Sequence, residues 1–110
     1  MGRLEREEGA LAAYVIVDVT VTDPEAYKEY TAQTPGSIAR YGGKFIVRGG
    51  AYETLEGEWN PQRIVVVEFP SMEQARAWYY GDEYQAILPI RQRNSTARFF
   101  TMVEGAADPS

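Results

Sequence analysis

The residues best suited to chemistry in this sequence are arginines, tyrosines and carboxylates, because histidine and cysteine are both absent. The commonest general base, the commonest metal ligand and the usual proximal haem ligand are therefore missing, as are thiolates and disulfides. A metal would have to bind through carboxylates alone, and we expect neither a metal site nor a cofactor. Any catalysis must use tyrosine, arginine and carboxylate groups, and the catalytic residues themselves stay unidentified.

Arg48 is the sharpest single candidate for binding an anion. It ends the apolar segment KFIVR and precedes Gly49-Gly50, where the backbone can turn and a guanidinium can reach a carboxylate. An ion pair with Glu53, Glu68 or an acid of a partner chain would explain the same residue equally well.

The other candidates are aromatic and basic residues on helix faces and strand edges where apolar residues would be expected. Together with Arg48, the candidate ligand-binding residues are Tyr27, Tyr30, Arg63, Trp78, Tyr79, Tyr84 and Arg91. For the tyrosines and Trp78, the competing interpretation is that they pack in the core, with the hydroxyl or indole N–H group hydrogen-bonded within the protein.

Two acids, Asp18 and Glu68, lie within apolar strand patterns. Burial would raise the pKa of either carboxyl, whereas a neighbouring arginine would keep it ionised. We expect pairing, with Arg48, Arg63 or Arg98 as the partner.

Four segments rich in β-branched and aromatic residues are predicted to be strands: residues 12–20, 44–48, 63–69 and 96–104. The second is expected to break at a bulge at Gly49-Gly50 and to continue to about Glu56.

A long amphipathic helix is predicted after Asp23, which is suited to cap it, and Pro24, which is suited to its first turn. Its buried face would carry aromatic and apolar residues spaced by three and four: Tyr27, Tyr30, Thr34, Ile38 and Tyr41. Pro35 predicts a kink near Thr34 or a restart there, and Gly42-Gly43 ends the helix.

Further helices are predicted after the third strand. Ser71 and Gln74 form a capping box that opens a helix ending at Gly81, and Asp82 with Gln85 repeats the pattern for a short helix to about Arg91. The order strand, helix, strand, strand, helix, strand is the ferredoxin-like βαββαβ plan of α+β proteins, with an antiparallel sheet.

Both faces of this sheet are predicted to be apolar. In the first strand Val15, Val17 and Val19 alternate with Tyr14, Ile16 and Asp18. Two helices cover only one face, so we expect a homodimer that buries the second sheet face. The alternative is that the N-terminal lead-in or the final segment folds over it.

The length of 110 residues predicts one domain, residues 12–105, with a flexible lead-in, 1–11, and a tail, 106–110. The net charge of −5 argues against nucleic acid as a partner. The apolar run Leu11 to Val17 is too short to span a membrane and no export signal is visible, so we expect no membrane partner and a cytoplasmic location.

Several segments together are similar to one known family. Tyr27-x-x-Tyr30, RYGGKFIVRGG at 40–50, WNPQRIVVVEFPS at 59–71, ARAWY at 75–79 and EYQ at 83–85 resemble the domain-of-unknown-function-1330 family, over about residues 12–105. The resemblance implies a dimeric α+β barrel, in which two ferredoxin-like subunits join their sheets. That family has no agreed activity. Related barrels include cofactor-free monooxygenases, lactone isomerases and haem enzymes, and the absence of histidine argues against the last.

Two functions remain. One is a cofactor-independent enzyme acting on a small aromatic or carboxylate-bearing metabolite, with Arg48 anchoring the anion and a tyrosine or carboxylate moving the proton. The alternative is a non-catalytic dimer that binds a small ligand or has a structural role. An enzyme should enclose a pocket with convergent polar groups, whereas a structural dimer should have a filled core and paired charges.

Overall fold

The computed structural model describes residues 11–107 and contains four strands and three helices in that range. In chain order they are β1 (Ala13–Val21), α1 (Pro24–Ala39), β2 (Lys44–Arg48), β3 (Ile64–Phe69), α2 (Met72–Tyr80), α3 (Asp82–Asn94) and β4 (Ser95–Glu104). Residues 1–10 of the predicted lead-in and 108–110 of the predicted tail lie outside the described part.

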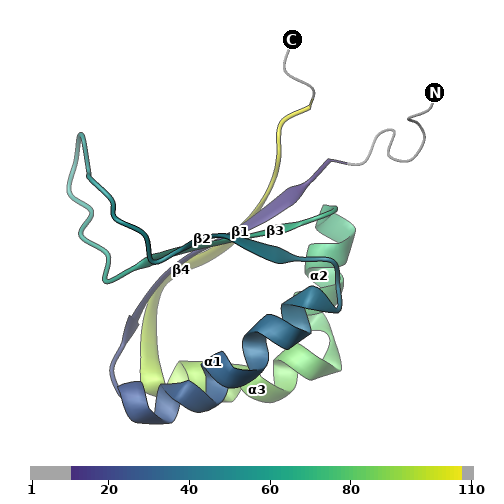
Figure 1. Ribbon diagram of the computed structural model, residues 1–110, viewed down its shortest axis with the longest axis horizontal. Coiled ribbons are helices and arrows are strands. Elements are labelled where there is room, and N and C mark those ends of the chain that lie inside the picture. The colour runs from purple at the N-terminus through teal and green to yellow at the C-terminus, as the bar shows by residue number, and fades with distance from the viewer. Residues whose placement is uncertain (1–10, 108–110) are drawn as a thin grey trace.

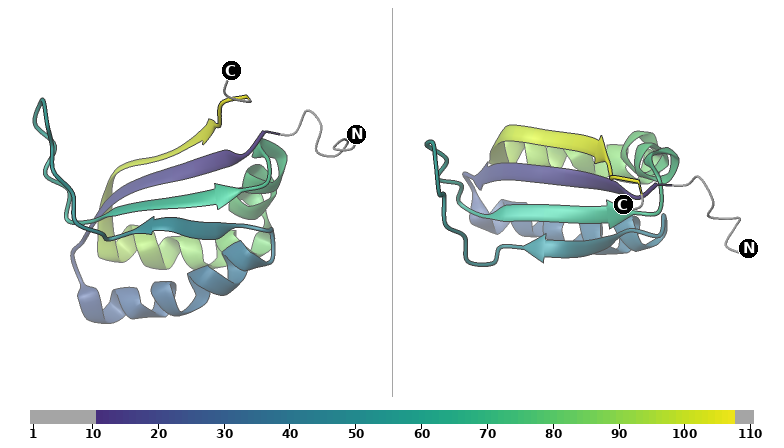
Figure 2. Two further views of the ribbon diagram at one scale, coloured as in Figure 1. Left: turned by 45° about the horizontal axis from the view of Figure 1, so that its top comes forward. Right: turned by 90° about the horizontal axis from the view of Figure 1, so that it is seen from above.

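The strands form one antiparallel sheet in the order β2-β3-β1-β4. All three helices cover the same face of this sheet, and no helix of the described residues lies on the opposite face (Figures 1 and 2). The predicted ferredoxin-like α+β fold is confirmed. No helix in the described part of the chain is long and apolar enough to cross a membrane.

Helix α1 begins where the sequence predicts, because the Asp23 side chain accepts a hydrogen bond from the backbone N–H of Ala26 at 3.2 Å. The predicted restart at Thr34 is wrong, since α1 continues through Pro35 to Ala39, and the alternative, a kink near Thr34, stays a prediction. A proline removes only one helical hydrogen bond. The turn that follows is held by packing, because Ile38 is buried in the core and Ser37 Oγ accepts a hydrogen bond from Trp78 Nε1 of α2.

Helix α2 has the predicted cap, with Ser71 Oγ accepting from Gln74 N–H at 3.1 Å. The second capping pattern is not formed. Gly81 is the N-cap of α3, with no side-chain cap hydrogen bond, and Asp82 is the first helical residue. The predicted short helix is in fact 13 residues long, against nine for α2.

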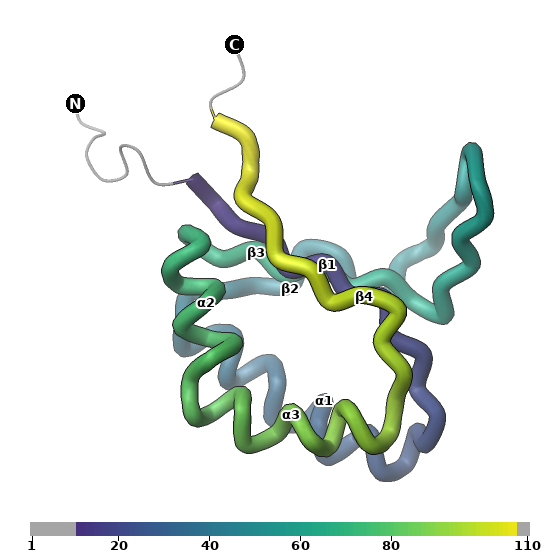
Figure 3. Tube along the Cα trace, turned by 180° about the vertical axis from the view of Figure 1, so that it is seen from behind, coloured from purple at the N-terminus to yellow at the C-terminus, as the bar shows by residue number. Residues whose placement is uncertain are grey.

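Strand β2 ends at Arg48, so the predicted continuation to Glu56 is wrong. Gly49 has a φ of 72° and donates to the Ile64 carbonyl at 2.8 Å, after which the chain leaves the sheet. Residues 49–63 form a loop that projects away from the helices (Figures 1 and 3). Hydrogen bonds from Tyr52 to the Pro61 carbonyl and from Thr54 to the Trp59 carbonyl tie its two arms together.

The core lies between the helices and the sheet. Val15, Val67 and Phe69 contribute from the strands, and Ile38, Trp78, Tyr84 and Ile87 contribute from the helices. On the opposite face of the sheet, Trp59 of the loop packs on Phe99 with ring centroids 5.8 Å apart. The described end of the final segment runs beside β1, where Gly105 N–H donates to the Ala12 carbonyl, and does not fold over that face.

Candidate ligand site between helix α1 and the sheet

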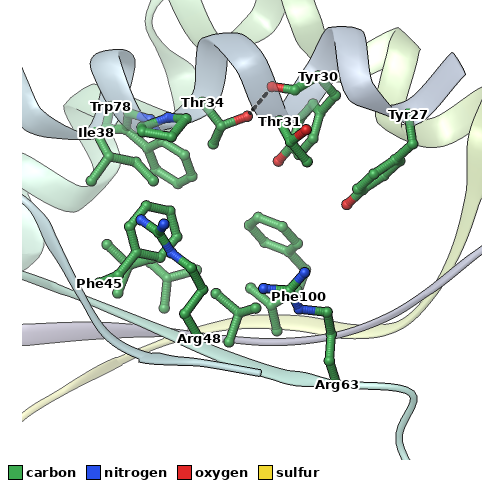
Figure 4. A pocket seen from close by; sticks show the side chains of 15 residues that line it. Tyr27, Tyr30, Thr31, Thr34, Ile38, Phe45, Arg48, Arg63, Trp78 and Phe100 are labelled. Atoms are coloured by element: carbon green, nitrogen blue, oxygen red, sulfur yellow. Dashed lines mark hydrogen bonds between the residues drawn. The ribbon is translucent and has the colours of Figure 1, made fainter. Parts of the chain in front are cut away.

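A cavity of about 230 Å³ lies between α1 and the sheet. Its walls are mostly apolar and come from every strand and from α1 and α2: Val15, Val17, Tyr27, Tyr30, Thr31, Thr34, Pro35, Ile38, Phe45, Arg48, Arg63, Val65, Val67, Trp78 and Phe100. Figure 4 shows Arg48 and Arg63 extending from the sheet toward α1, and the Tyr27 hydroxyl pointing into the cavity. The lining residues Thr31, Pro35, Arg48 and Arg63 are exposed, which places the mouth between α1 and the β2 side of the sheet.

A β-bulge directs Arg48 toward the cavity. Phe45 pairs with Val67 and Arg48 pairs with Val65, but Val47 pairs with Val66, so Ile46 is an extra residue without a partner. The bulge resets the alternation of side chains, and both Phe45 and Arg48 face the helices. The Arg48 guanidinium carbon lies 3.6 Å from the centroid of the Phe45 ring, a cation–π contact that holds the side chain over the cavity wall.

Arg63, directly before β3, packs beside Gly49. A methyl group at Gly49 would come within 3.1 Å of the Arg63 Nε, so the glycine leaves room for this guanidinium. Among the described residues neither Arg48 nor Arg63 forms a salt bridge. The alternative pairing of Arg48 with Glu53 or Glu68 is therefore wrong within the chain.

The strand acids have other partners than those predicted. Glu68 lies 3.6 Å from Lys44 Nζ and accepts from the Tyr14 hydroxyl at 3.1 Å, on the face away from the helices. Asp18, only 3% exposed, accepts from Trp59 Nε1 at 2.6 Å. The predicted arginine pairing fails because the sheet points these acids to the face opposite Arg48, where a lysine and the loop supply the donors.

Burial affects the hydroxyl groups of two tyrosines that line the cavity. Tyr27 is partly buried, and this burial raises the pKa of its hydroxyl although the charge of Arg91 opposes the effect. Tyr30 is 6% exposed, and burial together with the neighbouring Tyr84 raises the pKa of its hydroxyl. Both hydroxyls stay protonated at neutral pH and act as hydrogen-bond donors, not as bases.

Behind Tyr30 a chain of polar groups leads into the helical layer. The Tyr30 and Tyr84 hydroxyl oxygens are 2.7 Å apart, and Arg91 Nε donates to the Tyr84 hydroxyl at 3.1 Å. Burial raises the pKa of Tyr84, and the hydrogen bond between Tyr84 and Tyr30 and the charge of Arg91 oppose that shift.

The structure thus brings together most of the residues singled out in the sequence. Tyr27, Tyr30, Arg48, Arg63 and Trp78 line one cavity, with Tyr84 and Arg91 behind Tyr30. Trp78 serves as a wall, since its Nε1 donates to Ser37 Oγ at 3.0 Å. Tyr79 lies apart, beside a second hollow near α2 and β4 that is also lined by Arg76 and Tyr80.

Sequence reasoning missed Thr31, Phe45 and Phe100 as lining residues. Thr31 lies one helical turn after Tyr27 on the same face of α1, and Phe45 belongs to the apolar pattern of β2. Both residues could therefore have been predicted from the sequence. Among the described residues no group of three acids is placed to hold a metal ion.

A four-stranded antiparallel sheet in this order, with its helices on one face, defines a ferredoxin-like α+β protein, here with a cavity between the two layers. The family model described as "Domain of unknown function (DUF1330)" matches residues 12–106, and the chain belongs to this family. The resemblance seen in the sequence is confirmed.

Solved structures share the fold. A protein of unknown function from Rhodopseudomonas palustris, RPA0582, is 17% identical with a TM-score of 0.69, over 90% of this chain and 85% of that one. SnoaB, a cofactor-independent oxygenase from Streptomyces nogalater, is 16% identical with a TM-score of 0.54, over 92% of this chain and 97% of that one. No curated protein sequence matches the chain.

Proposed function

We propose that this protein binds a small organic carboxylate with an apolar or aromatic body in the cavity under α1. The observation that carries the proposal is the pair Arg48 and Arg63, two guanidinium groups without an acidic partner in the described chain, at the mouth of a mostly apolar cavity. Arginine binds carboxylates through two parallel hydrogen bonds, and an unpaired guanidinium beside an apolar cavity favours such a ligand.

The size of the cavity limits the ligand. An apolar cavity of about 150 Å³ accepts benzene in another protein. The volume of about 230 Å³ found here leaves room for one ring and a short substituent. A single-ring carboxylate, with the ring against Phe45 and Phe100 and the carboxylate at the arginines, fits these limits.

A second candidate function is cofactor-independent catalysis on such a ligand. The fold shared with SnoaB supports it only as an analogy, since similarity of fold does not transfer an activity. Among the described residues, the cavity lining includes the proton donors Tyr27 and Tyr30 but no aspartate, glutamate or histidine to serve as a general base. Binding is therefore better supported than proton abstraction by the protein.

Isothermal titration with benzoate, and with the uncharged benzamide as a matched ligand, tests the proposed binding. We expect benzoate to bind and benzamide to bind at least tenfold more weakly, because a hydrogen bond to a charged group contributes about 1.5–3 kcal/mol. Arg48→Gln and Arg63→Gln should each remove most of this preference. Arg93→Gln, on the exposed side of α3, is the control. Equal binding of the two ligands, or an unchanged preference in both cavity variants, contradicts the proposal.

We also propose that two copies pair through the sheet face that lacks helices. A row of side chains crosses this face, from Val47 through Val66 and Ile16 to Thr101, and Val47 and Val103 are 39% and 45% exposed. An apolar sheet face of this kind needs a cover, and a second copy of the same sheet provides one. The predicted cytoplasmic location stays a prediction.

Sedimentation equilibrium at micromolar concentration tests this pairing. We expect a dimer for the native chain and a folded monomer for Val66→Glu, because a carboxylate would be buried between the sheets. Gln33→Glu, on the exposed side of α1, adds the same charge elsewhere and should remain dimeric. A monomeric native chain rules out the proposed pairing.

A further inference from the structure

We propose that Tyr30 donates a hydrogen bond to an oxygen atom of the bound ligand, and that Arg91 is a positioning residue that directs this donor through Tyr84. The inference rests on the proposed function and adds a second recognition point, remote from Arg48 and Arg63. It predicts that the ligand carries an acceptor oxygen, such as a phenolate, enolate or carbonyl oxygen, in addition to its carboxylate.

Arg91 is buried, and it has no acidic partner in the part of the chain that the structure describes. It is 5% exposed, and it takes part in no salt bridge among the described residues. Its Nε donates to the Tyr84 hydroxyl at 3.1 Å, and its guanidinium carbon lies 4.4 Å from the centroid of the Phe100 ring. Buried arginines usually have a paired carboxylate, so this one has a different use in the structure.

Which group donates in the chain Arg91–Tyr84–Tyr30 follows from the donor hydrogens that each side chain carries. Arginine only donates, so the Tyr84 oxygen must accept from Arg91. The Tyr84 residue is 0% exposed, and the one acceptor within reach of its own hydrogen in the described chain is the Tyr30 oxygen, at 2.7 Å. Tyr84 therefore donates to Tyr30, because a buried hydroxyl hydrogen without an acceptor is costly.

This arrangement leaves the hydroxyl hydrogen of Tyr30 without an acceptor among the described residues. Tyr30 is a lining residue of the cavity. Among the described residues its hydroxyl is bonded to Tyr84 alone, and the nearby Thr34 hydroxyl donates to the Tyr30 carbonyl at 2.6 Å (Figure 4). Burial raises the pKa of Tyr30, which keeps the hydroxyl a donor. An oxygen atom of the ligand would accept this remaining hydrogen and complete the chain of hydrogen bonds.

The charge of Arg91 decides which oxygen is preferred. The hydrogen bond from the cationic Arg91 to Tyr84 makes both hydroxyl groups of the chain stronger donors, and a stronger donor at Tyr30 favours an oxygen that carries negative charge. A ring that bears a carboxylate for the two arginines and an ionisable hydroxyl for Tyr30 satisfies both ends of the site.

The experiment compares 4-hydroxy-3-nitrobenzoate with 3-nitrobenzoate, which lacks the second oxygen, in the full chain. We expect the hydroxy compound to bind at least tenfold more tightly, and its bound phenol to ionise at a lower pH than in solution, read from the phenolate absorbance. Tyr30→Phe should abolish both effects, whereas Tyr84→Phe and Arg91→Gln should weaken them. Tyr80→Phe removes an exposed hydroxyl of α2 outside this cavity and should change neither.

The outcomes separate this inference from the proposed function. If both compounds bind with equal affinity and binding still depends on Arg48, the carboxylate site is correct and the role of Tyr30 is wrong. If the affinity ratio survives in Tyr30→Phe, the inference is also overturned. If neither compound binds to the folded protein, both proposals fail. Circular dichroism of each variant checks that a lost effect is not a lost fold.

Discussion

The guanidinium carbon of Arg48 lies 3.6 Å from the centre of the Phe45 ring, although the two residues are an odd number of positions apart on one strand. In a regular strand such residues point to opposite faces of the sheet. They meet here because Ile46 is an extra residue, left unpaired between the pairs Phe45–Val67 and Val47–Val66.

This relationship predicts that the chain tolerates deletion of Ile46. Without it, Phe45, Val47 and Arg48 would follow one another in regular alternation with the same partners on β3, and Arg48 would still face the cavity. We expect the dissociation constant for benzoate, measured by calorimetry, to change by less than about threefold. Such a change is smaller than the loss of one hydrogen bond to a charged group would cause. Deletion of Val65, from the regular part of β3, is the contrasting variant and should abolish binding. Loss of binding by a folded Ile46 deletion would show that the bulge itself is required.

The hydrogen bond between Trp59 and Asp18 should contribute to stability. Trp59→Phe leaves a buried carboxylate without its donor, and we expect it to lower the free energy of unfolding by about 2 kcal/mol or more. Asp18→Asn keeps an acceptor oxygen and should cost less. Urea unfolding of both variants and of the double variant measures the coupling, which should reach at least about 0.5 kcal/mol. Strict additivity would mean that the contact contributes nothing.

Gly43 has no room for a side chain. A methyl group there would lie 2.6 Å from Phe69 Cε1 and 2.7 Å from Ile38 Cγ2, both in the core. We expect Gly43→Ala to cost about 1–3 kcal/mol in thermal or urea unfolding, as other overpacked cores do. At Gly50 a methyl group would meet nothing within 4 Å, so Gly50→Ala should change the free energy of unfolding by less than about 0.5 kcal/mol. Equal effects of the two substitutions would contradict the packing argument.

The pairing of Arg40 with Glu83, which joins α1 to α3, should make stability depend on acid. Arg40 Nε donates to the two Glu83 oxygens at 2.9 and 3.0 Å, and these hydrogen bonds lower the pKa of Glu83 below its ordinary 4.5, against a smaller effect of burial. A lowered pKa in the folded state gives stability that is present above pH 4.5 and is lost as the pH falls through the folded value.

Arg40→Gln should therefore narrow the difference in melting temperature between pH 6 and pH 3. Differential scanning calorimetry of the native chain and the variant measures this difference. Lys28→Gln, which removes the exposed pair of Lys28 with Glu25 on α1, is the matched control and should leave it unchanged. A variant with the full native dependence on pH would show that other carboxylates account for the acid sensitivity.

Local signals in the sequence determined the elements and several of their ends. Asp23 and Ser71 cap the helices that the sequence predicts, because a capping bond joins a side chain to a backbone group only three residues away. Periodicity likewise identified the four strands and the face of α1 that carries Tyr27 and Tyr30. The composition showed that neither histidine nor cysteine can take part in any chemistry, because the chain contains neither. The position of Arg48 beside Gly49-Gly50 indicated that it could bind an anion.

Only the tertiary structure decided how these residues meet. The bulge at Ile46 exists in the pairing of β2 with β3, the donor to Asp18 comes from a loop residue 41 positions away, and Tyr30 meets Tyr84 across 54 positions. Such contacts depend on sheet register and on the packing of helices against it, which no short window of sequence contains. The sequence by itself determined which side chains are present and which elements carry them. The assembled sheet and helices decided that two arginines and two tyrosines surround one cavity, because only packing brings their elements together.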